Sequence, residues 1–106
     1  MELKTYDEVQ EFIHKQGFKM LYISRDACSV CHALLPKVEA MLKEFPKIEM
    51  GKLMIDEVEE LAGELSIFTV PAMLIYIDDK EMFRYARFVS IDEMRQKINK
   101  YYELYY

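Results

Sequence analysis

Residues 28–31 read Cys28-Ser29-Val30-Cys31 and hold the only two cysteines of the chain. The apolar segment 20–24 just before them has the pattern of a buried strand. After them, apolar residues recur up to Phe45 at the spacing of an amphipathic helix. The two sulfurs are therefore expected where a strand gives way to a helix N-terminus, whose free N–H groups and dipole stabilise negative charge. Because that environment favours the reactive thiolate, the position indicates redox chemistry.

The length of 106 residues predicts a single domain, residues 1–106, that buries enough surface to fold without a disulfide or metal. A net charge of −5 argues against a nucleic-acid partner, which requires a basic surface. No apolar run approaches the ~20 residues of a membrane span, and residues 1–8 lack a hydrophobic signal region. These features predict a cytoplasmic protein without membrane contact. In that reducing compartment the cysteine pair indicates redox catalysis or metal binding.

Local signals predict an α/β chain with the element order α-β-α-β-α-β-β-α. The alternation of helices and strands indicates parallel pairing in the first part, and a hairpin near the end makes the sheet mixed. Capping boxes at 5–8 and 90–93 begin the first and last helices, and Gly17 ends the first. The other elements are strands at 19–24, 48–55, 72–77 and 81–89, and helices at 28–45 and 57–65. We therefore expect a sandwich with a mixed central sheet of about four strands flanked by helices.

This order, together with four motifs, resembles the thioredoxin family over nearly the whole chain. Cys28 and Cys31 match the redox pair of the family, and Pro36 matches the proline inside its long helix. Lys52 matches the lysine of the central strand beneath the pair, and Val70-Pro71 matches the cis-proline dipeptide. The resemblance implies a thioredoxin-like three-layer sandwich and the activity of a thiol–disulfide oxidoreductase.

The chain departs from the family pattern at four places around the pair. Ala27 replaces a tryptophan, and Ser29-Val30 replaces the Gly-Pro between the cysteines. Tyr22 replaces a buried aspartate that helps to deprotonate the resolving cysteine, and Arg87 aligns with a glycine that lines the substrate groove. These departures indicate a divergent relative, whose substrate range and reduction potential do not follow from the family.

Cys28, at the start of the predicted helix, is the expected nucleophile. It attacks a substrate disulfide to form a mixed disulfide, which Cys31 resolves from one helical turn deeper. In the family, a cis peptide bond at Val70-Pro71 lies opposite the first cysteine. That geometry leaves the Val70 backbone free to pair with an extended substrate segment, and Pro71 shapes the turn. The alternative is a trans proline that only begins a strand.

Three further side chains are candidates for tuning the thiols. His32 lies four residues after Cys28 and shares its helical face, so an imidazolium there would stabilise the thiolate. The alternative for His32 is a solvated side chain without effect. Tyr22 is a poor base at neutral pH and is expected to pack in the core. Either Tyr22 hydrogen-bonds Lys52, or Lys52 extends outward and resolution relies on water.

Three other functions fit parts of the sequence. Residues 28–32 spell the C-x-x-C-H signature of c-type haem attachment, but no export signal accompanies it. The two cysteines and His32 provide three donors, one fewer than a closed zinc site requires, so we expect no metal. A thioredoxin fold with inactive thiols could instead be an interaction domain, which the groove altered at Arg87 supports. The tyrosine-rich residues 101–106 would then be its contact surface; the alternative is that they cap the last helix and cover the sheet.

The favoured function is reduction of protein or small-molecule disulfides by a monomer that cycles Cys28 and Cys31 between dithiol and disulfide. No bound cofactor is expected, because the two cysteines carry the electrons. The resemblance implies that a thioredoxin reductase or a small-thiol pool regenerates the dithiol.

Overall fold

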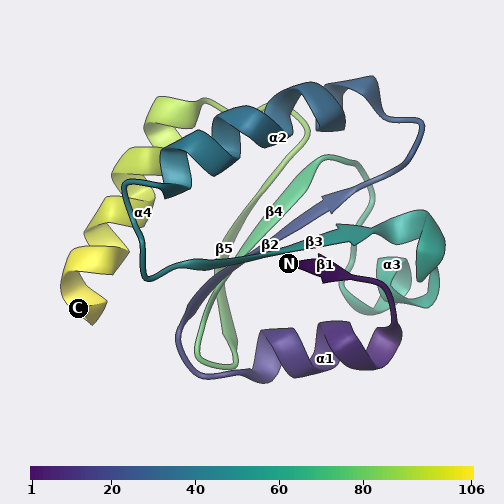
Figure 1. Ribbon diagram of the computed structural model, residues 1–106, viewed down its shortest axis with the longest axis horizontal. Helices are drawn as coiled ribbons and strands as arrows, with labels where there is room; N and C mark the ends of the chain where they lie inside the picture. Colours follow the sequence, from purple (N-terminus) through teal and green to yellow (C-terminus); the bar gives the residue numbers. More distant parts are fainter.

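The computed structural model describes residues 1–106 and shows a mixed five-stranded sheet with helices on both faces (Figure 1). The strand order is β1-β3-β2-β4-β5; β1, β3 and β2 are parallel, and β4 and β5 are each antiparallel to the preceding strand in that order. The predicted α/β class and layered arrangement are confirmed. No helix combines the length and the apolar character that a membrane crossing requires. In chain order the elements are β1 (Glu2–Leu3), α1 (Tyr6–His14), β2 (Phe18–Ser24), α2 (Ser29–Leu42), β3 (Glu49–Met54), a 3-10 turn (Ile55–Glu57), α3 (Glu60–Glu64), β4 (Ala72–Ile77), β5 (Lys80–Ala86) and α4 (Ile91–Tyr105).

The sheet has one strand more than the four that the sequence predicted. β1 contains only Glu2 and Leu3, which pair with Lys52 and Leu53 of β3. The N–H of Lys52 also donates to the Met1 carbonyl at 2.8 Å. Two residues carry no alternating pattern, so local sequence could not signal this strand.

β2 lies in the middle of the sheet, and both of its faces are covered. One core separates the sheet from α1 and α3, and the other separates it from α2 and α4 (Figure 1). Successive side chains of β2 enter opposite cores, which explains its continuous apolar run. The exception is Lys19, whose buried ammonium group donates to the carbonyls of Lys15 and Asp78. These bonds compensate the burial of a polar group.

The helix ends follow the predicted signals with small differences. At α1 the capping box is complete, because Thr5 Oγ1 accepts from the Glu8 N–H and the Glu8 carboxylate accepts from the Thr5 N–H, both at 3.1 Å. At α4 only half of the predicted box forms, with the Ser90 hydroxyl accepting from the Glu93 N–H at 3.3 Å. α2 ends at Leu42, before the predicted residue 45, and α3 is shorter than predicted.

Asp78 joins the turn between β4 and β5 to two distant segments. Its Oδ1 accepts from the Gly17 N–H and from the Tyr105 hydroxyl, both at 2.9 Å. The hydrogen bond from Gly17 lowers the pKa of Asp78 most. The hydrogen bond from Tyr105 and the nearby charge of Lys19 lower it further. A carboxyl whose pKa is lowered on folding stabilises the protein above its unfolded pKa, and this contribution is lost as pH falls through the folded pKa.

Asp78→Asn is expected to flatten the acid limb of the stability profile. Asparagine keeps an oxygen acceptor and tolerates the left-handed backbone of this residue, φ 55°, but it does not titrate. We expect the free energy of unfolding of the wild type to fall more steeply than that of the variant below about pH 5. Urea unfolding from pH 2 to 7 measures the difference. Asp79→Asn removes a neighbouring charge and serves as the control; equal slopes for all three proteins would contradict the prediction.

Candidate active site

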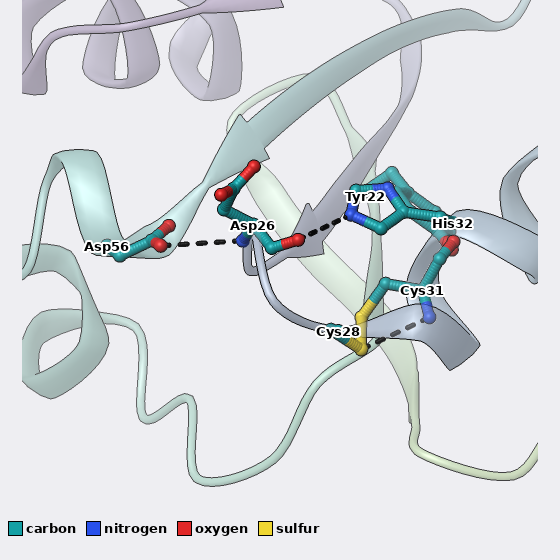
Figure 2. Close-up of a disulfide and its surroundings, with 6 residues drawn as sticks. All are labelled: Tyr22, Asp26, Cys28, Cys31, His32 and Asp56. Atoms are coloured by element: carbon teal, nitrogen blue, oxygen red, sulfur yellow. Dashed lines mark hydrogen bonds between the residues drawn. A yellow bond between two sulfur atoms is a disulfide. The ribbon is translucent and has the colours of Figure 1, made fainter.

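Cys28 and Cys31 lie where β2 is followed by α2, as the sequence predicted. They are joined as a disulfide, with their Cα atoms 5.3 Å apart. Cys28 caps α2, and its Sγ accepts from the Cys31 N–H at 3.1 Å (Figure 2). Cys28 is partly exposed, whereas Cys31 is fully buried. The outer sulfur is therefore accessible from the surface, and the inner sulfur is not.

The position of Cys28 favours a thiolate. The first N–H groups of a helix have no partner within the helix, and the helix dipole places partial positive charge at this end. The hydrogen bond from the Cys31 N–H to the Cys28 sulfur directs one of those donors at the reactive atom. In the reduced protein, a negative charge on the Cys28 sulfur would make this hydrogen bond charge-assisted and thus stronger.

The register of the sheet brings three loops to the cysteines. Ile23 of β2 pairs with Ala72 of β4, and Ala72 pairs with Ala86 of β5, so these residues form one row across the sheet. The segments beyond this row, 24–28, 70–71 and 87–88, therefore lie at the same end of the sheet. The Val70-Pro71 peptide bond is cis, which confirms that prediction and excludes the trans alternative.

The side chain of Tyr22 contacts the backbone of Cys31, the inner cysteine. The buried hydroxyl of Tyr22 donates to the Cys31 carbonyl at 2.6 Å. Burial raises the pKa of Tyr22 to about 12, and the negative charge of Glu39 acts in the same direction. Tyr22 is therefore protonated at neutral pH and cannot accept the thiol proton. Its effect on the thiols stays a prediction.

Lys52 lies beside Tyr22 on the neighbouring strand but does not bond to it. The two residues are partners across β2 and β3. The Lys52 Nζ instead lies 3.5 Å from a carboxylate oxygen of Glu2 and 3.5 Å from one of Glu39. The Tyr22–Lys52 hydrogen bond that one sequence hypothesis required is thus wrong, and Lys52 extends outward as the other required. A cavity of about 60 Å³ adjoins both side chains, and this is enough to admit water.

His32 is tied to the loop that precedes Cys28. Its Nε2 lies 2.8 Å from the carbonyl oxygen of Asp26, and because a carbonyl only accepts, Nε2 carries the proton (Figure 2). The Asp26 N–H in turn donates to the Asp56 carboxylate at 3.4 Å. The sequence assigned no role to Asp26 or Asp56, and no local pattern could have linked positions 30 residues apart. The predicted action of His32 on the Cys28 thiolate stays a prediction.

The structure contains no group of three or more His, Cys, Asp and Glu side chains placed to hold a metal ion. Cys28, Cys31 and His32 therefore do not by themselves form such a group.

Comparison with known proteins agrees with this geometry. The family model for thioredoxin matches residues 2–100. The chain belongs to the thioredoxin family. A thioredoxin-like protein YdfQ of Bacillus subtilis (strain 168) is 44% identical over 103 residues, which cover 97% of this chain and 92% of the relative. A thioredoxin of Geodia cydonium is 30% identical over 100 residues, 92% of this chain and 94% of the relative. The X-ray structure of Fasciola hepatica thioredoxin superposes with a TM-score of 0.81 at 28% identity, covering 93% of this chain and 96% of that one.

Membership of the thioredoxin family and a cysteine pair at bonding distance identify a thiol–disulfide oxidoreductase. The solved relatives share the layered arrangement in Figure 1. The substitutions Ala27, Ser29 and Arg87 lie at the same end of the sheet as the cysteines. They distinguish this chain from the family pattern at the end of the sheet that carries the redox pair.

Proposed function

We propose that this protein reduces the disulfide bonds of proteins and small molecules by cycling Cys28 and Cys31 between dithiol and disulfide. The observation that supports the proposal best is the asymmetry of the pair. Cys28 is partly exposed and receives a backbone hydrogen bond on its sulfur, whereas Cys31 is fully buried one turn deeper. The exposed Cys28 sulfur is suited to attack the substrate disulfide, and the buried Cys31 sulfur is suited to release the substrate from the mixed disulfide.

The reaction consists of two thiol–disulfide exchanges. The Cys28 thiolate attacks one sulfur of the substrate disulfide; the substrate S–S bond breaks, and the departing sulfur takes a proton. Cys31 then loses its proton and attacks the Cys28 sulfur, which releases the second substrate sulfur as a thiol. Two electrons pass to the substrate, and the protein keeps the new disulfide between Cys28 and Cys31.

The surrounding residues have separate roles in this proposal. The backbone of Val70, before the cis bond to Pro71, pairs with an extended substrate segment. Tyr22 holds the carbonyl of Cys31 and takes no proton, so the proton of Cys31 passes to water and not to this side chain. Lys52 and His32 adjust the electrostatic environment of the thiols.

The remaining parts of the proposal concern the setting of the reaction. One domain, residues 1–106, acts as a monomer in the cytoplasm and needs no bound cofactor, because the cysteines carry the electrons. A thioredoxin reductase or a small-thiol pool returns the disulfide to the dithiol. A second candidate is an interaction domain with inactive thiols, and the exposed side chains of Phe68 and Phe88 favour it.

A redox titration separates these functions. The protein is equilibrated in defined thiol–disulfide buffers, and free thiols are counted by mass spectrometry after alkylation. A reversible two-electron transition near about −270 mV is the result expected of a reductase. A value near about −120 mV indicates oxidising chemistry and argues against the cytoplasm. A pair that forms no disulfide at any buffer potential refutes the enzyme and leaves the interaction domain.

A further inference from the structure

The arginines of the chain divide into two kinds. Arg84 and Arg95 are each held by carboxylates of the chain. Arg25 and Arg87 form no ion pair. These two follow β2 and β5, the strands whose ends lie at the same end of the sheet as the cysteines. Arginines without a partner therefore occur only at the end of the sheet that carries the redox pair.

The backbone fixes Arg87 against the cis-proline turn. Its N–H donates to the Pro71 carbonyl at 2.7 Å. Its φ is 69°, in the left-handed region that glycine adopts freely and that strains a residue with a side chain. The backbone therefore does not favour arginine here, and strain of this kind points to a use for the side chain.

The Arg87 side chain lies over an exposed aromatic ring. The guanidinium carbon is 5.5 Å from the centroid of the Phe88 ring, and Phe88 is 82% exposed. Arg25, in contrast, is followed directly by Asp26, whose N–H is bonded to the carboxylate of Asp56. Neither arginine forms an ion pair, so the contact with the Phe88 ring is what distinguishes Arg87 from Arg25.

We propose that Arg87 is a specificity-determining residue that selects disulfides whose flanking segment carries an acidic side chain beside the attacked half-cystine. The proposal rests on the proposed function and names its substrate class. A substrate segment that pairs with the Val70 backbone passes next to Arg87, because the Arg87 N–H donates to the carbonyl of the adjacent Pro71. The planar guanidinium can hold a carboxylate through two parallel N–H bonds, and the Phe88 ring supports it from one face.

The positive charge of Arg87 is opposite in sign to the net charge of the chain. At −5 the protein as a whole repels acidic partners. A free arginine at the contact reverses that preference for the segment that actually docks. With glycine at this position, the protein would have no cation there to select a docked segment with an acidic side chain.

The test compares two peptides that differ at one residue. Both contain an intramolecular disulfide, and the residue two positions before the first half-cystine is Glu in one and Lys in the other. The pre-reduced protein is mixed with each peptide, and the second-order rate constant of a single turnover is measured. We expect the Glu peptide to react about three- to tenfold faster at low salt. The ratio should shrink in about 1 M salt, where the screening length is short.

Two variants of Arg87 and one control complete the experiment. Arg87→Gly should lower the ratio to one or below, because only the net negative charge of the protein then acts on the two peptides. The fold should be kept, because glycine adopts this φ without strain. Arg87→Glu should reverse the ratio. Arg95→Gln removes the same charge beside Glu44, beyond the opposite end of α2 from the cysteines, and should leave the ratio unchanged.

The outcomes separate this proposal from the proposed function. Equal rates for both peptides with the wild type, or a ratio that survives in Arg87→Gly, would overturn the role of Arg87 and leave the reductase intact. A wild type that reduces neither peptide refutes the proposed function, and the specificity falls with it.

Discussion

Cys28→Ser is expected to lower the rate of disulfide reduction to the uncatalysed background, whereas Cys31→Ser is expected to stop the reaction at the mixed disulfide. A serine hydroxyl remains protonated at neutral pH, so it cannot replace the attacking thiolate. In Cys31→Ser the outer sulfur still attacks, but no second sulfur is present to release the substrate. Mass spectrometry after incubation with a disulfide substrate should show the adduct on Cys31→Ser alone.

The different effects of the two variants follow from burial. Cys31 has no exposed surface, so it cannot meet a substrate disulfide directly. Cys28 is partly exposed and accepts a backbone hydrogen bond at its sulfur. If the roles were exchanged, the adduct would form on Cys28→Ser instead.

Val30→Ala is the matched control for both cysteine variants. Val30 lies between the cysteines and is 53% exposed, so truncating it leaves both sulfurs and the core in place. Full turnover in Cys28→Ser or in Cys31→Ser, beside normal turnover in Val30→Ala, would contradict the proposed cycle. Loss of turnover in Val30→Ala as well would assign the effect to the docking surface and not to the sulfurs.

The central features of the site could be predicted because each has a local signal. The cysteines follow a fully apolar strand and precede an amphipathic helix, so their place in the fold follows from two periodicities. The Val70-Pro71 turn precedes another apolar strand and matched a known dipeptide, and its cis bond is confirmed. The alternation of helices and strands sufficed for the α/β class.

The contacts that the sequence could not predict join distant segments. The outward course of Lys52 was one of two hypotheses, but its partners were not predicted: they are Glu39 and Glu2, which β1 brings beside it. The partner of Tyr22 is a backbone carbonyl, which no side-chain pattern reports. The Arg87 N–H bonds to the Pro71 carbonyl, and this contact exists only once β4 and β5 are paired.

Gly51→Ala is expected to destabilise the protein by about 1–3 kcal/mol. Gly51 lies on β3, where a Cβ atom would be 2.7 Å from Leu3 Cδ1 and 2.9 Å from two ring atoms of Phe12. Both neighbours are buried, Leu3 on β1 and Phe12 on α1, so neither can move aside without disturbing this core. Gly51→Val should cost more, because its two methyl groups extend further into the same space. Urea unfolding measures the change in the free energy of unfolding.

Gly63→Ala is the control for Gly51→Ala, because it replaces a glycine at a position where the added methyl group is not crowded. Nothing lies within 4 Å of the position of its Cβ, and Gly63 is inside α3, where alanine is favoured over glycine by about 0.5–1 kcal/mol. This variant should therefore be at least as stable as the wild type. If Gly51→Ala proved as stable as Gly63→Ala, the close approach of β1 and α1 to β3 would be wrong. The same measurement therefore tests whether Leu3 of β1 and Phe12 of α1 pack against Gly51 in solution.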